Sequence, residues 1–517
     1  MKNNGCGKLF CLKCTIAIIF IVLISVVSAS SETVPAKKMT VAIIAEPDSV
    51  DLSSTRHEPT AMILNRNWTE LLIDLSPDGK RIPGLATSWQ VSPDGRQIDF
   101  TLRQGVAFHS GDPLTIQDVE FSFNRYKERT SATGLRWVEK FEIIDDYSFR
   151  LYFKKPDVNF IPNLAFIPIV SKSYHDRVGE DEFVRKPSGT GPYRFLEWKI
   201  GEYIRVEANE NYWGEAPDLK EVIFRIVKED TTRIAMIKSG EADIIMDTPF
   251  ALVKSLEASG FKTVKQPSMP TCQVIFQTFN KDVPWYDRRV RLAIAHAIDG
   301  DGIVNGLFHG IPARYARIAP WELGYDPDLK PYAYDPEKSK QLLAEAGYPD
   351  GLEIPLYYPT GRVTGIRETA EAVVLFLKAV GIKCKVEGME IAKYMDRVRN
   401  EWHGNPDGVD VSVGTPPSAH YPDPTWALQV AYYSKSPTGL YDNPEFDKVI
   451  LEALSELDET KRADLIKKAT RIIHEDVASI PIWSNMSVFT MHPNVVFKPT
   501  KGTQYAIIRA KDLKYKD

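Results

Sequence analysis

The 517-residue sequence has few cysteines, and most of them lie at its beginning. Three of the five occur within the first 14 residues, which leaves Cys272 and Cys384 for the rest of the chain. These two are 112 positions apart, and that spacing does not specify a bridge. Two free buried thiols and one disulfide both remain open on the sequence alone.

The sequence also lacks an apolar run of full membrane-spanning length. Its longest, TIAIIFIVLISVV at 15–27, is shorter than the roughly 20 residues that a transmembrane helix needs. Lys2, Lys8 and Lys13 precede the apolar core, and VSA follows it at 27–29. This layout predicts a secretory signal peptide over 1–29 and therefore a periplasmic or other extracytoplasmic location, with an uncleaved anchor as the alternative.

An excess of positive charge is missing as well. Without the predicted leader, 61 basic residues stand against 69 acidic ones, a balance of −8. Nucleic-acid binding is not expected, because it calls for clustered positive charge. The remaining 488 residues exceed what one hydrophobic core usually organises, so two or three domains are expected.

Motifs for catalysis are absent too. The chain has no G-x-S-x-G nucleophile turn, no H-E-x-x-H zinc motif and no phosphate-binding loop. GTGPYR at 189–194 begins like a dinucleotide fingerprint, but Arg194 stands at the third glycine position and Pro192 would break the turn. No enzymatic activity, cofactor or protein-bound metal is therefore expected.

What the sequence does contain is a steady alternation of short strand and helix patterns. The patterns favour a strand at 38–47, a strand at 96–103, a capped helix at 114–127, a helix at 335–348 that begins after Asp335, a strand–helix–strand unit at 352–358, 365–380 and 382–389, a strand at 408–414, and a final helix with a strand at 479–483. Strand, helix and strand in that order predict a locally parallel sheet, so the fold class is α/β.

Several long segments resemble one known family. GLATSWQVSPDGRQIDFTLRQGVAFHSGDPLTIQDVEFSFNR (84–125) is similar to the signature region of family 5 extracellular solute-binding proteins, the oligopeptide-, dipeptide- and nickel-binding receptors of ABC importers. Further matching segments follow in the family's order: SGTGPYRFLEWKIGEYIRVEANENYWG (188–214), KEDTTRIAMIKSGEADI (228–244), VRLAIAHAIDGDGIV (290–304) and GYDPDLKPYAYDPEKSKQLLAEAGYPDG (324–351).

The resemblance implies a two-lobed periplasmic-binding-protein fold (type II) with an extra inserted subdomain. The implied boundaries are 38–80, 193–270 and 488–517 for lobe I, 81–192 for the inserted subdomain, and 271–487 for lobe II. The chain would cross between lobes near 265–274 and 484–489, and few crossings permit rigid lobes to rotate about a hinge. A monomer is implied, which closes on a small solute and delivers it to membrane permease subunits of an ABC transporter.

The resemblance also implies a ligand-facing loop at AHYPDP (419–424). Peptide-binding relatives carry an aspartate there that holds the peptide's ammonium group, and the matching position in this chain is His420. An imidazole cannot supply the anion, so a simple peptide bound through its amino terminus is not expected. Asp423 is the nearby acid that could substitute, while Tyr421 and Trp426 could line the site as flat apolar walls.

Other candidate contacts come from two further segments. Arg367, with Arg362 as its neighbour, matches the arginine that relatives use for the peptide carboxylate, and Glu46 would face the solute from the other lobe. A single histidine is not a metal site, so a nickel-type chelate ranks below an anionic or uncharged organic solute. A peptide-like solute, an organic anion, a sugar and a metal chelate all stay open, as do a secreted enzyme and a sensory receptor.

Overall fold

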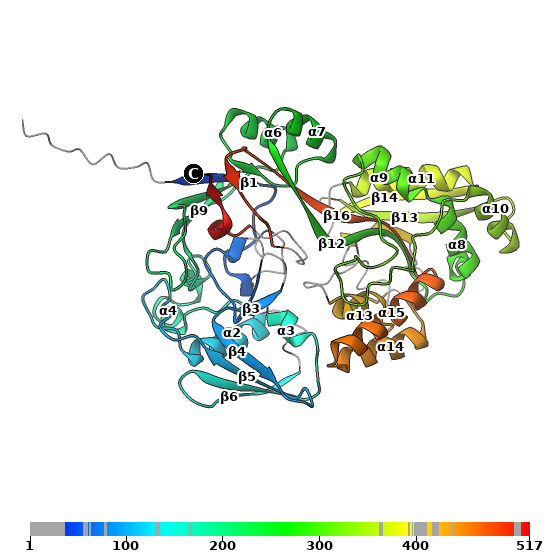
Figure 1. The fold of residues 1–517 in the computed structure, drawn as a ribbon. Helices are drawn as coiled ribbons and strands as arrows, with labels where there is room; N and C mark the ends of the chain where they lie inside the picture. Colours follow the sequence, from blue (N-terminus) through cyan, green and yellow to red (C-terminus); the bar gives the residue numbers. More distant parts are fainter. Residues whose placement is uncertain are drawn as a thin grey trace, which may run out of the picture. The chain divides into compact units, whose positions relative to one another are not determined.

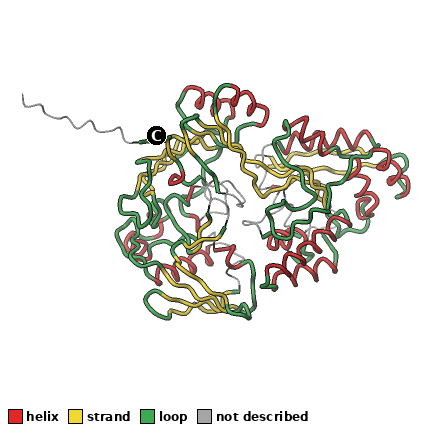
Figure 2. Tube along the Cα trace, in the orientation of Figure 1, coloured by secondary structure: helices red, strands yellow, loops and turns green. Residues whose placement is uncertain are grey.

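The computed structural model describes residues 37–54, 60, 64–76, 80–129, 135, 137–164, 167–360, 365–390, 393–394, 397, 411–415, 423–436, 438–439, 441–500 and 508–516. Helices and strands alternate through these residues (Figure 1, Figure 2), which confirms the α/β prediction. The leader predicted at 1–29 lies outside them.

The largest sheet is built around one long antiparallel ladder. Its strand order is β14-β13-β15-β12-β16-β11-β1-β10-β9-β8, with β12 (Lys262–Phe276) and β16 (Ser479–Met491) as the longest members (Figure 1). Lys262 pairs with Met491 at one end of this ladder, and Ile275 pairs with Ser479 at the other. The other strands are β1 (Lys38–Ile43), β8 (Tyr193–Lys199), β9 (Tyr203–Ala208), β10 (Glu221–Ile226), β11 (Ile244–Ile245), β13 (Leu352–Thr360), β14 (Ile382–Glu390) and β15 (Val411–Gly414).

The two ends of the ladder belong to different hydrophobic cores. Val274 and Phe276 of β12 pack with β13 and with α8 (Arg288–Ala297), α9 (Gly300–Phe308) and α11 (Ile366–Ala379). Phe489 and Met491 of β16 pack instead with β1, β8, β9 and β10. The ladder therefore joins two separately packed regions, because apolar side chains at each end remove area from water in a different core.

A smaller sheet has the order β4-β5-β7-β6. Its strands are β4 (Ala86–Val91), β5 (Gln97–Leu102), β6 (Val138–Ile143) and β7 (Ser148–Phe153), and buried residues alternate along β5 as the pattern at 96–103 predicts. The buried face packs with α2 (Ile116–Arg129). Asp118 in the first turn of α2 accepts hydrogen bonds from the N–H and hydroxyl of Thr115 at 2.8 and 2.7 Å, which confirms the predicted start of this helix.

The strand–helix–strand prediction is also confirmed. β13 and β14 pair in parallel from Leu352 opposite Ile382 to Thr360 opposite Glu390, and α11 lies between them in the chain. The expected cap Asp335 accepts a hydrogen bond from the Lys338 N–H at 2.9 Å at the start of α10 (Pro336–Glu345).

The remaining elements complete the two cores and a helical layer made by α13, α14 and α15. The helices are α3 (Phe160–Asn163), α4 (Lys172–Val178), α5 (Glu180–Phe183), α6 (Asp230–Ser239), α7 (Phe250–Ala258), α13 (Thr425–Tyr432), α14 (Pro444–Ser455) and α15 (Glu459–Glu475). The shorter strands and 3-10 turns are β2 (Ile73–Leu75), β3 (Arg81–Pro83), β17 (Val495–Val496), β18 (Lys514–Tyr515), Leu52–Ser54, Pro284–Tyr286 and Ala510–Asp512.

The glycines of GTGPYR have a packing role. The Gly191 N–H donates to the Trp68 carbonyl at 3.2 Å, and a Cβ on Gly189 would lie 2.1 Å from the same oxygen. The His109 N–H donates to the Gly189 carbonyl at 2.8 Å. Two backbone segments therefore approach so closely that neither position has room for a side chain, which agrees with the exclusion of a dinucleotide loop.

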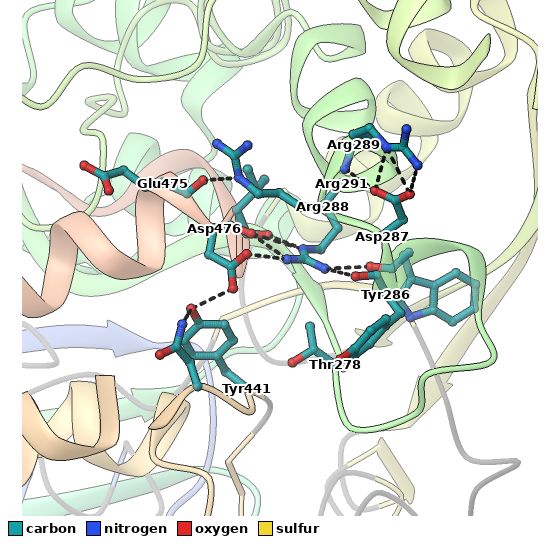
Figure 3. Close-up of polar contacts among 12 residues, drawn as sticks. Thr278, Tyr286, Asp287, Arg288, Arg289, Arg291, Tyr441, Glu475 and Asp476 are labelled. Atoms are coloured by element: carbon teal, nitrogen blue, oxygen red, sulfur yellow. Dashed lines mark hydrogen bonds and ion pairs between the residues drawn. The ribbon is translucent and has the colours of Figure 1, made fainter. Parts of the chain in front are cut away.

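A buried arginine ties α8 to the end of α15 (Figure 3). The Arg291 guanidinium donates to the carbonyls of Trp285 and Tyr286 at 2.9 and 2.7 Å, and to the Asp476 carbonyl and carboxylate at 2.7 and 2.8 Å. Its Nε also donates to the Val477 carbonyl at 3.1 Å. The carbonyls of the C-cap residue Asp476 and of Val477 after it thus find a cationic donor at the end of α15, where a positive charge suits the helix dipole.

Both remaining cysteines are free. Cys272 is buried on β12, and Cys384 is half-buried on β14. Burial raises the pKa of both thiols, to about 11 for Cys384, so each is protonated and unreactive at neutral pH. Of the two alternatives open on the sequence, the free thiols are the outcome.

Candidate functional site

The strand registers direct two sets of carboxyl ends toward the middle of the β12–β16 ladder. β11 runs along β16 from Met491, and the Thr248 N–H beyond it donates to the Val488 carbonyl at 2.9 Å. β1 and β10 are parallel to β11. β15 runs along β12 in the opposite sense, from Val411 opposite Phe276 to Gly414 opposite Gln273, and β13 is parallel to it.

Loops at the carboxyl ends of parallel strands are where α/β proteins bind ligands. In this chain the loop after β15 contains His420, the loop after β13 contains Arg362, and the loop after β1 contains Glu46. All three sequence-predicted segments therefore leave strands whose ends point toward the middle of the same ladder. His420, Tyr421 and Arg362 themselves lie outside the described residues.

Asp423 has two internal partners. Its Oδ2 accepts from the Arg462 Nε of α15 at 2.9 Å, and both side chains are only 9 % exposed. Its Oδ1 accepts from the N–H and hydroxyl of Thr425, the first residue of α13, at 3.0 and 2.5 Å. The carboxylate is thus charge-neutralised within the protein, and Trp426 beside it is half-buried in the first turn of α13.

Asp423→Asn is expected to lower the free energy of unfolding by about 3 kcal/mol, because Arg462 would keep its buried charge without an anionic partner. Urea unfolding followed by tryptophan fluorescence measures this. Asp464→Asn on the exposed side of α15 is the control, since its carboxylate is 73 % exposed, and it should change stability little. An Asp423 variant as stable as the control would contradict the role assigned to the Asp423–Arg462 pair.

Arg367 is the second residue of α11 and is exposed. Its side chain is 71 % accessible, and its Nε lies 2.9 Å from Glu371 one turn along the helix. An exposed pair of this kind is weak, so the guanidinium remains available to another anion.

Glu46 is held by a neighbouring hairpin. Its Oε1 accepts from the Trp198 indole N–H at 2.9 Å and from the Gly201 N–H at 2.7 Å, which ties the end of β1 to the β8–β9 turn. This oxygen therefore has a structural task that the sequence pattern did not indicate.

Asp247 is an acidic residue at the same edge that sequence inspection missed. It follows β11, is half-buried, and has a left-handed backbone with φ of 47°, which is uncommon outside glycine, asparagine and aspartate. Burial raises the pKa of its carboxyl to about 6, despite the Arg233 guanidinium and the Ser487 hydroxyl. The abrupt polar punctuation of Asp-Thr-Pro after ADIIM was the only sequence signal for it.

The raised pKa of Asp247 predicts a pH dependence of stability. Because the folded state holds this proton more tightly than the unfolded chain, stability contributed by the neutral carboxyl falls as pH rises from about 4 to about 6. Asparagine tolerates the same backbone conformation as aspartate. The free energy of unfolding of Asp247→Asn is expected to exceed that of the wild type by about 1–3 kcal/mol at pH 8, and to equal it or fall below it at pH 4.

Urea midpoints at pH 4, 6 and 8 test the pH dependence, with Asp458→Asn as a control of opposite sign. Hydrogen bonds from Lys461 and Thr460 hold the pKa of Asp458 below its usual range, so that variant should lose stability at neutral pH. If the stability of Asp247→Asn relative to the wild type does not increase between pH 4 and pH 8, the raised pKa of Asp247 is ruled out.

Comparison with known proteins identifies the family. The model of "Bacterial extracellular solute-binding proteins, family 5 Middle" matches residues 80–437, more than half of the sequence. The chain belongs to this family. The heme-binding protein A of Haemophilus influenzae is 30% identical over 449 residues, covering 80% of each chain.

Two solved structures show the same fold. One is the ABC transporter-associated periplasmic binding protein DppA from Helicobacter pylori in complex with the peptide STSA, with a TM-score of 0.79, 26% identity, and 93% and 99% of the two chains covered. The other is NikA from Brucella suis in complex with Fe(III)-EDTA, with a TM-score of 0.81, 25% identity, and 93% and 100% covered. This family 5 solute-binding protein therefore has the α/β, two-lobed periplasmic-binding-protein fold and serves as a solute receptor of the ABC-transporter type.

None of the helices that the structure describes is both long and apolar enough to cross a membrane. Within the same residues, no group of three or more histidine, cysteine, aspartate or glutamate side chains is arranged to hold a metal ion.

Proposed function

We propose that this protein is the extracytoplasmic receptor of an ABC importer for a small organic solute that is anionic or uncharged, and that it catalyses no reaction. The choice of solute class rests on one observation, namely that the Asp423 carboxylate is already paired within the protein. The peptide's ammonium group needs an anion in this loop, and the sequence offers only Asp423 beside His420. That carboxylate is already paired with Arg462 at 2.9 Å.

The proposed site consists of the loops after β13 and β15, with Arg362, Arg367, His420, Tyr421 and Trp426 as contacts. The exposed Arg367 supports an anionic group on the solute, since a guanidinium matches a carboxylate in shape and charge. Glu46 and Asp423 are given supporting tasks in this proposal, because Glu46 already accepts two hydrogen bonds from the protein and Asp423 accepts three.

The working cycle is a binding cycle. The two lobes, proposed at 38–80, 193–270 and 488–517 and at 271–487, are joined by the β12–β16 ladder, and 81–192 forms the inserted subdomain. Solute that contacts both lobes binds the closed form more tightly and shifts the population toward it by that difference. The closed complex then delivers the solute to permease subunits, after export directed by the leader at 1–29.

A thermal-shift panel tests the proposal. Organic carboxylates, N-acetylated dipeptides, sugars, metal chelates and unmodified dipeptides are added to the purified protein. At 100 times its dissociation constant a ligand stabilises the folded state by about 2.7 kcal/mol. We expect a rise in melting temperature with carboxylates lacking a free amino group, and a smaller one with unmodified dipeptides.

His420→Ala should weaken the response to the active compound. A response to unmodified dipeptides alone would contradict the proposed solute class. Mass spectrometry that finds a panel compound chemically converted would contradict the absence of catalysis.

A further inference from the structure

A segment without regular secondary structure, residues 313–325, lies against the middle of β16 and is called the strap here. At its start the Ser484 N–H donates to the Ala313 carbonyl at 2.7 Å. Val488 lies four residues further along β16, and its carbonyl accepts the hydrogen bond from the Thr248 N–H, which follows β11. In a β-strand the backbone N–H and C=O groups of every second residue point to the same edge. Ser484 and Val488 therefore use the same edge of β16, so the strap and the segment after β11 both bind to that edge.

The strap is anchored by a buried arginine. The Arg317 guanidinium, 7 % exposed, donates to Gln273 on β12 at 3.2 Å, to Tyr432 on α13 at 3.0 Å and to the hydroxyl and carbonyl of Ser479 on β16 at 2.6 and 3.0 Å. Four hydrogen bonds from one planar group fix both its position and its orientation.

Further contacts hold the rest of the strap. Ile318 is buried in the core formed by α13, α14 and α15, and Leu323 packs against it. Gly324 has a φ of 75°, and a Cβ at this position would lie 2.6 Å from Ile466. A segment anchored at both ends and through its middle holds its remaining side chains in place, which is what a binding wall requires.

Two aromatic side chains of the strap lie against each other. Trp321 is 38 % exposed, and its ring stands perpendicular to that of the half-buried Tyr315, with centroids 5.6 Å apart. Such a pair offers flat apolar area with polar edges, and aromatic walls of this kind are common in binding sites for organic solutes.

Glu322 follows Trp321 in the strap. Its Oε2 accepts from the Ala319 N–H at 2.5 Å, and the side chain is half-buried. Besides burial, the negative charge of Asp423 contributes to a raised pKa of the Glu322 carboxyl, and Asp423 is itself paired with Arg462 of α15.

Further titratable groups among the described residues near Glu322 lie in the strap or follow it. The pKa of the Tyr315 hydroxyl is raised by its burial and by the nearby Tyr325 and Glu322 side chains. Asp326 is paired with Arg471 of α15 at 2.6 Å. Burial, aided by the Asp423 charge, raises the pKa of Glu322 to about 7, although the Ala319 N–H opposes this, so the carboxyl exchanges its proton near neutral pH.

We propose that the strap is a second wall of the solute site, in which Trp321 and Tyr315 contact an apolar part of an organic carboxylate and the neutral Glu322 carboxyl donates a hydrogen bond to its carboxylate or carbonyl oxygen. This inference rests on the proposed function, because it takes the loop that ends at Asp423 to face the solute. A neutral carboxyl is a donor, whereas an ionised one repels an anion, so capture of the solute is linked to uptake of one proton.

The test uses N-acetyl-Phe-Ala, which has a ring, a free carboxylate and no ammonium group. Titration calorimetry at pH 6 and pH 8 should show wild-type affinity falling about tenfold over this interval, as expected for one linked proton near pH 7. Glu322→Gln retains a donor without titrating and should bind almost equally at both pH values. Trp321→Ala should lose about tenfold in affinity at both, and Trp321→Phe should lose less.

Glu337→Gln on α10, with a side chain 82 % exposed, is the matched control and should behave as the wild type. The inference is overturned if the wild type does not bind the probe, or if the Trp321 and Glu322 variants match it at both pH values. The proposed function fails in a different way, namely when the purified protein retains no solute and no member of the thermal-shift panel stabilises it.

Discussion

Arg291→Met is expected to lower the free energy of unfolding by about 3–5 kcal/mol, the range found when a buried charged group loses its partner. The whole Arg291 residue is only 3 % exposed, and its guanidinium donates to four backbone carbonyls and one carboxylate (Figure 3). Methionine fills similar volume but supplies no donor. The buried carbonyls would then carry the cost of lost hydrogen bonds.

The loss should extend beyond one side chain. Asp476, which Arg291 neutralises, also accepts from the Tyr441 hydroxyl at 2.8 Å. Without the arginine its carboxylate would remain as a poorly compensated charge between α15 and the segment before α14. The unfolding midpoint in urea, followed by circular dichroism, measures the combined effect.

Arg289→Met is the matched control two residues along the same helix. Arg289 pairs with Asp287 at 2.6 Å, but its side chain is 50 % exposed, and exposed ion pairs contribute about 0–1 kcal/mol. The two variants make the same chemical change in different surroundings. Equal effects would contradict the account of Arg291 as a buried clamp.

Gly189→Ala is expected to be the second severe change, at about 3 kcal/mol or more. The added Cβ would lie 2.1 Å from the Trp68 carbonyl oxygen and 2.9 Å from the Thr69 Cα, and both are backbone atoms that a rotamer change cannot move aside. The contact between the two backbone segments must therefore open, which would also disturb the hydrogen bond from Gly191 to Trp68.

Gly306→Ala provides the control for the same exchange. Gly306 lies in α9, where an added Cβ would meet open space, and alanine is favoured over glycine in a helix by about 1 kcal/mol. Melting curves should place this variant at or above the wild type and Gly189→Ala well below it. A Gly189→Ala protein that melts with the wild type would show that the backbone contact is not close.

Local pattern predicted much of the fold because the responsible interactions are local. The cap at Asp335 acts on Lys338 three residues later, and the parallel pair β13–β14 follows from apolar runs with one helix between them. The long strand β12 was harder to foresee. Pro267 indicates a break by pattern, yet the strand continues past it with a shift of register between Pro267 and Thr271.

The candidate site was less predictable because its electrostatics depend on distant residues. Arg462, which neutralises Asp423, lies 39 positions away on another helix. Glu46 finds its partners about 150 residues along the chain, in the β8–β9 turn. Neither pairing leaves a trace in the local pattern, so sequence alone offered both carboxylates as possible ligand contacts.

Native mass spectrometry of freshly purified protein tests the central claim most directly. We expect a one-to-one complex that releases, on denaturation, a small organic molecule with a carboxylate or with neutral polar groups and without a free peptide amino terminus. Release of an unmodified peptide with a free amino terminus would contradict the proposed solute class. A protein that retains nothing and gains no stability from any compound in the panel would contradict its role as a solute receptor.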